Sequence, residues 1–371
     1  MANEYEFYPP DPRRLPMPEG ERFRRQRRAA YLLEHCGEYS TARRAEIKRE
    51  LLRQGLDALP AVKDAVREGT ADTLAFTKSV LNLLVADEIG LQIAKGLDAH
   101  EDSYPVETGA AWIAKLKDHT LSPSRITEAL AHLSHKASTK ISEALSVTPA
   151  EALKMGRSLD VLYRLGEFWR EEDFKGNTED YQDPRNSWLS DVLERKTGLP
   201  ITLSIVFMSI CRHLGLDAQG VGLPFHFVVR VEVATHDTEG FLFVDPFHGA
   251  RPLDLEDCRK LVESSGQSFD PQEHLQGSTS REILVRMCNN LVNLFDNREN
   301  PIEAERAATV LMHLCPRNPV PRMVRAERRL RRGETPLACE DLNAVIQMDR
   351  DGPAGVAAKT LLKKVLFGHP V

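Results

Sequence analysis

The chain has 371 residues and a net charge of −6 at pH 7, with 42% hydrophobic and 28% charged residues. This composition is typical of a globular protein of roughly two or three domains, and the negative charge gives no general reason to expect nucleic-acid binding. The longest charge-free apolar stretch, 200–211, is too short to span a bilayer, and residues 1–14 lack the apolar core of a signal peptide. We therefore expect a cytoplasmic protein without a nucleic-acid or membrane partner.

The N-terminal part reads as an arm followed by helices. Residues 1–20 hold five of the 22 prolines and show no hydrophobic periodicity, which predicts an extended arm. The basic run that follows is typical either of a patch for an anionic surface or of the solvated face of a first helix, which we favour. Apolar residues then recur at three- and four-residue steps, and the segment LLRQGLDALPAVKDAV resembles a HEAT-type helix pair. We predict a HEAT-like helical domain over 21–150.

The C-terminal part, 279–371, is again helical in pattern. Apolar stripes begin at Ile283 and at Ala304, and Ala304 and Ala338 stand 34 residues apart. This period, with Pro316 ending the first unit, is similar to tetratricopeptide repeats. The second unit has Arg350 where a matching proline would stand, so the pattern covers about one and a half repeats. Such a unit needs a neighbour to bury its apolar face, so we expect it to pack on the domain before it.

The segment 151–278 contains the residues that could take part in catalysis. Residues 200–214 are apolar on nearly all sides, which predicts a central buried helix that begins at Pro200 and ends at Gly215. The next segment alternates and predicts a strand whose core face includes Phe225 and Phe227, with His226 on the other face. A hairpin then returns a strand that ends at Asp245. A carboxylate there could fix the tautomer of the His226 imidazole, or the pair could serve structure alone.

Three motifs in this segment carry a family resemblance. G-L-P-x-x-L begins at Gly198, G-L-P-x-H-F at Gly222 and D-P-F-x-G at Asp245. Together they resemble the transglutaminase-like domain of the bacterial SirB type, in which a tetratricopeptide-like region follows. The resemblance covers about 155–350 and implies an α+β fold of the cysteine-peptidase kind, with a helix packed on an antiparallel sheet.

The resemblance also implies a catalytic triad, of which this chain supplies two members. His226 matches the catalytic histidine and Asp245 the aspartate, but counting back from Gly215 places the nucleophilic cysteine at Pro200. A proline side chain has no group that a neighbouring base can activate. Thr202 and Ser204 follow within a turn and are the nearby hydroxyls that could substitute, although we expect both to serve the helix backbone.

The other side chains of interest are either cleft residues or structural ones. Asn186 belongs to a polar run before the helix, which also includes Tyr181 and could line a cleft or form a well-hydrogen-bonded loop, the role we favour. Arg230 shares the polar face of the His226 strand and is a further candidate for lining a cleft. His248 follows Asp245 by three residues, which makes a metal site with His226 and Asp245 conceivable. We expect no metal and no other cofactor, because no supporting polar residues are evident around His248. The dispersed cysteines predict reduced core residues: Cys36, Cys211, Cys258, Cys288, Cys315 and Cys339.

Two functions remain open at this point. The first, which we prefer, is a catalytically degenerate transglutaminase-like protein that binds a protein or peptide partner as a regulatory module. The second is a live hydrolase or acyltransferase in which His226 and Asp245 activate water or a hydroxyl. The residue at position 200 favours the first.

Overall fold

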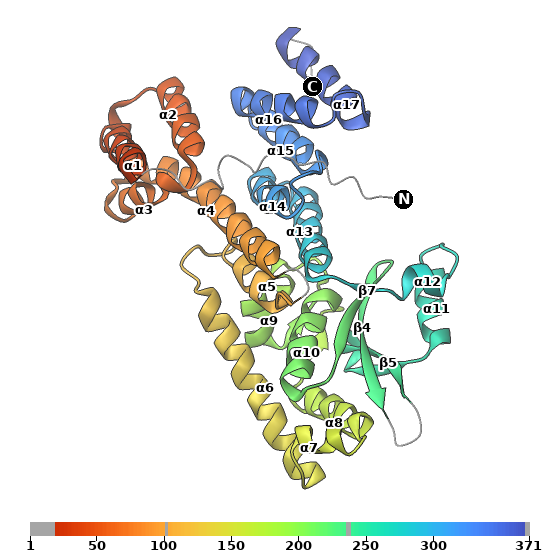
Figure 1. Cartoon of the computed structure of the whole chain (residues 1–371). Coiled ribbons are helices and arrows are strands. Elements are labelled where there is room, and N and C mark those ends of the chain that lie inside the picture. Colours follow the sequence, from red (N-terminus) through yellow and green to blue (C-terminus); the bar gives the residue numbers. More distant parts are fainter. Residues whose placement is uncertain (1–18, 101–102, 235–238, 368–371) are drawn as a thin grey trace. The chain divides into compact units, whose positions relative to one another are not determined.

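The structure is a computed structural model that describes residues 19–100, 103–234 and 239–367. It forms two compact units, Met1–Glu88 and Ile89–Val371 (Figure 1). The predicted extended arm, 1–20, lies almost wholly outside the described residues. Within the described ranges, no helix combines the length and the apolar character needed to cross a bilayer.

The first unit is helical, as its periodicity predicted. The basic run lies on its first helix, where Arg28 pairs with Glu50 at 2.9 Å and Arg22 lies 3.5 Å from Asp57. These ion pairs agree with the solvated-face interpretation of the run. The elements are α1 (Glu19–Glu34), η2 (Cys36–Glu38), α2 (Thr41–Gln54), η3 (Gly55–Asp57), α3 (Leu59–Glu68) and the first part of α4 (Ala71–Ala99).

The second unit is an α+β fold, as the sequence predicted. Before its sheet it carries the end of α4, then α5 (Val106–Ala114), α6 (Pro123–Leu145), α7 (Pro149–Lys154), α8 (Ser158–Glu171), η4 (Pro184–Asn186) and α9 (Leu189–Arg195). Thr148 and Glu151 cap α7 reciprocally, and a proline opens both α6 and α7. The helix α10 (Pro200–Leu214) has the bounds that its sequence predicted, and Gly215 ends it in the left-handed region at φ 84°.

A five-stranded antiparallel sheet, in the order β6-β5-β4-β3-β7, lies beside α10. A separate short parallel pair precedes α10. The strands and the elements between them are β1 (Lys175–Gly176), β2 (Thr197–Gly198), β3 (Ala218–Leu223), β4 (His226–Ala234), β5 (Glu239–Asp245), η5 (Pro246–His248), β6 (Arg251–Leu253), α11 (Leu255–Glu263), α12 (Pro271–His274) and β7 (Gly277–Ser278).

Both faces of the sheet are covered, which the alternation along β4 did not predict. Phe227, Val229 and Val231 are buried, as expected for the face that meets α10. Val228, from the other face, is buried as well, because it joins an apolar cluster with Phe243 and with residues of α11. The strand therefore lies between two layers of helix, and its apolar run is longer than a half-exposed strand would need.

The prediction that Phe225 belongs to the core is wrong. Leu223 pairs directly with His226, so Pro224 and Phe225 form a two-residue turn between β3 and β4. Phe225 has φ 56° and is 86% exposed. Proline followed by a residue of positive φ is typical of a type II turn, where glycine normally takes the second position. A bulky aromatic side chain therefore projects from the tip of the hairpin that ends at His226.

The C-terminal helices follow one another as a packed series (Figure 1). The stripes that begin at Ile283 and Ala304 are buried, as predicted. The first residues of α14 and α16 are 34 positions apart. Arg329 joins Glu305 and Asp341 in a buried ionic network that the sequence pattern did not reveal. The helices are α13 (Ser280–Asn297), α14 (Pro301–Leu314), α15 (Val320–Arg331), α16 (Thr335–Met348) and α17 (Pro353–Phe367).

Replacing Phe225 by glycine is predicted to stabilise the protein. The change removes the steric cost of a side chain in the left-handed region, about 1–2 kcal/mol, and part of that gain is offset by the greater freedom of an unfolded glycine. We expect Phe225→Gly to raise the free energy of unfolding by roughly 0.5–1 kcal/mol in urea titrations. Phe225→Ala is the matched control, because it removes the ring and keeps the Cβ; it should give no such gain. A loss of stability in the glycine variant would show that the ring itself stabilises the turn.

Candidate functional site

Asp245 is the centre of the candidate site. It ends β5, and its side chain is 1% exposed. Its Oδ1 accepts the backbone N–H groups of Phe247 at 3.1 Å and His248 at 3.3 Å, which caps the short η5 turn. The carboxylate is therefore fixed in place by the turn that follows it, because Pro246 starts that turn and leaves the next two N–H groups free to bond.

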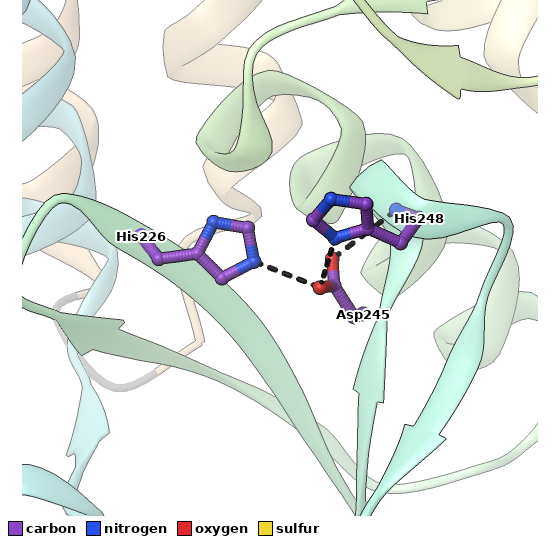
Figure 2. A group of neighbouring side chains, drawn as sticks. All are labelled: His226, Asp245 and His248. Atoms are coloured by element: carbon purple, nitrogen blue, oxygen red, sulfur yellow. Dashed lines mark hydrogen bonds and ion pairs between the residues drawn. The ribbon is translucent and has the colours of Figure 1, made fainter. Parts of the chain in front are cut away.

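Two imidazoles converge on the other carboxylate oxygen (Figure 2). His226 Nε2, at the start of β4, lies 2.9 Å from Asp245 Oδ2, and His248 Nδ1, in η5, lies 2.6 Å from the same atom. Strands β4 and β5 are adjacent and antiparallel, as the sequence order predicted. The structure thus brings His226, Asp245 and His248 together, and the hydrogen-bonded pair of His226 and Asp245 is present.

The cluster has a distinct electrostatic character. Burial raises the pKa of the Asp245 carboxyl, but hydrogen bonds and charge from His226, and then from His248, outweigh burial and hold that pKa below its ordinary value. Since an ionised carboxylate only accepts, the bonded ring nitrogens donate, and Nδ1 of His226 and Nε2 of His248 are left as acceptors in the neutral rings. The His226 side chain is 11% exposed and that of His248 is 53% exposed. The cluster therefore offers two proton acceptors, of which the His226 ring is largely buried and the His248 ring is half exposed to solvent.

The N-terminus of α10 lies beside this cluster. Ser204, in the second turn of the helix, is 3.4 Å from the carbonyl of Phe227, the residue after His226. A Cβ on Gly176 of β1 would lie 2.4 Å from the Phe247 ring, so η5 packs on the strand pair that leads into the helix. Pro200 is buried at the first helical position. The position that the resemblance assigns to a nucleophile thus holds a side chain without a reactive group.

The two nearby hydroxyls are held by backbone groups. Thr202 Oγ1 donates to the carbonyl of Asn186 at 2.8 Å and accepts the N–H of Leu199 at 3.0 Å. Ser204 Oγ makes the contact to Phe227 already described. Both side chains are buried. Each hydroxyl therefore does what the sequence analysis expected of it, which is to satisfy backbone groups around the helix start.

The cysteines are unsuited to act as nucleophiles at this site. Cys211 is buried in α10, and burial raises the pKa of its thiol. Burial raises the pKa of Cys258 to about 11, with a further contribution from the carboxylates of Asp257, Asp254 and Asp245. Since the thiolate is the reactive form, burial disfavours nucleophilic attack by either thiol.

Asn186 and Arg230 were candidates for lining a cleft, with a hydrogen-bonded loop as the favoured role of the run that contains Asn186, and the structure gives each residue its own partners. Asn186 is fully buried, and its Nδ2 donates to the carbonyl of Asp180 at 2.8 Å, so it orders the loop before α9. Arg230 bonds Gln219 at 2.8 Å and lies over the Phe241 ring. These hydrogen bonds and ring contacts join both side chains to their neighbours and not to the histidine cluster.

Sequence reasoning missed Arg286, and it placed Tyr181 only within the polar run before the helix. The Arg286 guanidinium, from α13, donates to the carbonyls of Leu223 at 2.7 Å and His226 at 2.8 Å, so it clamps both ends of the Pro224–Phe225 turn. Burial lowers the pKa of this guanidinium. The Tyr181 ring lies 6.3 Å from that of Phe247, which places it next to the cluster. A lone arginine in an amphipathic helix gives no signal that it binds a hairpin 60 residues earlier.

The cluster is also the candidate metal site. Among the described residues, His226, Asp245 and His248 are the group of three potential ligands whose donor atoms all lie within 4.8 Å of one another. Two imidazoles and a carboxylate are a ligand set that zinc accepts. The sequence analysis expected no metal, on the ground that support around His248 was not evident. The ring nitrogens that face the carboxylate already donate to it, so a metal held by these same atoms would have to displace the two ring protons.

Comparison with known proteins supports a transglutaminase-like fold for the region that contains the site. A sequence model of the transglutaminase-like superfamily matches residues 124–289. A UPF0162 protein of Xylella fastidiosa is 33% identical over 211 residues, which are 56% of this chain and 70% of that protein. The chain belongs to the UPF0162 family. A Pseudomonas aeruginosa UPF0162 protein is 29% identical over 211 residues, 56% of this chain and 71% of its own length.

A more distant similarity reaches a eukaryotic protein. Human F-box only protein 21 is 34% identical over 126 residues, which are 33% of this chain and 19% of that protein. No solved structure matches the chain at a significant level. The superfamily match begins inside α6, within the region expected to be the N-terminal helical domain, and it ends inside α13. The domain boundaries given above stay a prediction.

The two histidines of this UPF0162 protein should differ in their contribution to stability. His226→Ala leaves one side of a buried carboxylate unpaired, and we expect a loss of about 1–3 kcal/mol in the free energy of unfolding. His248→Ala is the matched control: it removes a bond to the same oxygen, but the ring is half exposed, so the loss should stay under about 1 kcal/mol. Urea titrations of both variants measure the difference. Equal losses would contradict the view that burial decides the strength of these bonds.

The depressed pKa of Asp245 predicts an acid-dependent loss of stability. A carboxyl whose pKa is lower in the folded state contributes stability that is complete above its unfolded value, about 3.9, and is lost as the pH falls through the folded value. Asp245→Asn removes this contribution. We therefore expect the stability of the wild type to approach that of the variant as the pH falls below about 4. A constant difference between the two proteins from pH 7 to pH 3 would contradict the assignment.

Proposed function

We propose that this protein is a catalytically degenerate member of the transglutaminase-like superfamily, of the SirB type, that binds a polypeptide partner in the cytoplasm as a regulatory module. The observation that carries the proposal is the absence of an activatable nucleophile near His226 among the described residues. Pro200 takes the first position of α10, and the neighbouring hydroxyls of Thr202 and Ser204 form hydrogen bonds with backbone groups.

The exposed features around the cluster support a binding role. Phe225 stands at the tip of its hairpin with most of its ring in solvent, and an exposed aromatic side chain on a fixed turn is typical of a contact residue. Arg286 holds both ends of that turn, so the ring is presented on a rigid support. A partner would therefore meet a site whose backbone is already ordered, which reduces the entropy lost on binding.

The C-terminal helices offer a second surface for a partner. In this proposal α13 to α17 form a tetratricopeptide-like series, which the sequential packing of the helices and the 34-residue step support. Repeats of this kind present a continuous helical face to other proteins. The region adjoins the candidate site directly, because α13 carries Arg286.

A second candidate function rests on the histidine–aspartate pair. His226 keeps the hydrogen bond to Asp245 that orients a general base, and its Nδ1 is left as an acceptor. In this alternative the imidazole takes a proton from water, and the resulting hydroxide attacks an amide or ester carbonyl. The C–N or C–O bond of the substrate then breaks, and the protonated ring returns the proton to the leaving amine or alcohol. The reaction would be a hydrolysis, and acyl transfer would follow if an amine or hydroxyl replaced water.

One assay that measures both binding and turnover distinguishes the two candidate functions. A mixed-sequence library of fluorescein-labelled decapeptides is incubated with the full chain, binding is followed by anisotropy, and cleavage or acyl transfer is followed by mass spectrometry. We expect binding without turnover, unchanged after alkylation of accessible thiols with iodoacetamide, because each cysteine thiol lies at least partly buried with a raised pKa. Turnover that is lost in a folded His226→Ala variant would favour the hydrolase.

A further inference from the structure

A polar cavity lies beside the candidate site. It has a volume of about 140 Å³ and is bounded on one side by α13 and on the other by the segment 181–187. Leu199, the residue before the start of α10, forms part of its wall. The cavity therefore begins at the same helix N-terminus that the histidine cluster adjoins, but its lining is a separate set of side chains.

Three asparagines of α13 form a row along this cavity. Asn290, Asn293 and Asn297 all line it, and their spacing of three and four residues places them on one face of the helix. The row spans seven residues, or about 10.5 Å at the rise of an α-helix. An extended chain repeats every two residues at about 6.6–6.8 Å. The row thus matches the length of roughly three residues of extended polypeptide.

The carboxamide is well suited to recognise a peptide backbone. Each one carries both a donor and an acceptor, and in an extended strand the N–H and C=O of one residue point to the same side. A row of asparagines can therefore pair with successive outward-facing residues of a bound strand. Such pairing reads the main chain and leaves the side chains of the ligand largely free to vary.

A buried hydroxyl in the wall points to a ligand. Ser187 lines the cavity and is buried, and its Oγ has no hydrogen-bond partner among the described residues. A buried polar atom without a partner costs stability. The hydroxyl would gain a partner when a polar ligand enters.

The charge of the lining favours a neutral ligand. Asp183 is its one charged residue, and its carboxylate already pairs with Arg185 at 2.8 Å and Arg195 at 3.3 Å. The other lining groups are amides, hydroxyls and apolar side chains. A phosphate or nucleic-acid backbone would find no free cation within this lining, whereas a peptide backbone brings the neutral donors and acceptors that amides prefer.

The cavity is connected to the histidine cluster through aromatic contacts. Tyr181 lines the cavity, and its ring contacts Phe247, which in turn lies 5.9 Å from the His226 ring. Arg286, one helical turn before Asn290, clamps the hairpin that ends at His226. The cavity and the histidine cluster thus share supporting residues.

We infer that the asparagine row and Ser187 bind an extended polypeptide segment through its main chain. The inference rests on the proposed function and specifies which surface holds the peptide and how. The experiment uses the full chain and the decapeptide probes that bind it in the library assay, together with copies of the same peptides N-methylated at their central amides. The variants are Asn290→Ala and Ser187→Ala. The control is Asn289→Ala, which removes an exposed carboxamide from the neighbouring position of α13.

We expect Asn290→Ala and Ser187→Ala each to weaken peptide binding by about fivefold or more, the effect of roughly one lost hydrogen bond. Asn289→Ala should change affinity by less than about twofold. Ser187→Ala should melt no lower than the wild type in the absence of peptide, since its hydroxyl has no partner to lose. N-methylated peptides should bind far more weakly than the unmodified ones.

Each other result has a definite meaning. If peptides bind but neither Asn290→Ala nor Ser187→Ala weakens them, this inference is wrong while the proposed binding function stands. If N-methylation leaves the affinity unchanged, main-chain recognition is wrong. If no peptide of the library binds the wild type, the inference and the proposed binding function both fail.

Discussion

The buried carboxylate of Asp245 is the constraint on which the site depends. An ionised group removed from water must be surrounded by donors, and here the donors come from two backbone N–H groups and two imidazoles. These four hydrogen bonds together fix the positions of the end of β5, the η5 turn and the start of β4. Through Phe247 the turn then packs on the strand pair before α10. The hydrogen bonding of one charge therefore assembles three separate segments around one helix N-terminus.

The parts of this arrangement that sequence could predict are those written in local patterns. The apolar run and its flanking Pro200 and Gly215 gave the bounds of α10 correctly. The alternation before the hairpin and the Asp-Pro step located the two strands and hence the histidine–aspartate pair. Periodicity and capping act within a few residues, so these features survive without any knowledge of the tertiary fold.

The parts that sequence missed depend on contacts between distant segments. Phe225 seemed to continue the apolar alternation, but Pro224 starts a tight turn there, and turn geometry overrides the strand pattern. Val228 is buried because α11, 30 residues later, covers its face. Arg286 and the asparagines of α13 carry no local sequence signal that distinguishes them from the ordinary polar side of an amphipathic helix. Only the tertiary structure shows that this side meets a hairpin and a cavity rather than solvent alone.

The same long-range dependence explains why α13 resists assignment to one domain. Its apolar face packs on α14 and opens the C-terminal helical series, while Arg286 on another face closes the hairpin of the sheet. The superfamily match ends at residue 289, inside this helix and after Arg286. The boundary at 278, which follows the return of the helical pattern in the sequence, would separate the hairpin carbonyls from the Arg286 guanidinium that binds them. The helix α13 therefore belongs to both regions. A ligand held along its polar face would contact the helix that supports the histidine cluster and that also begins the C-terminal helical series.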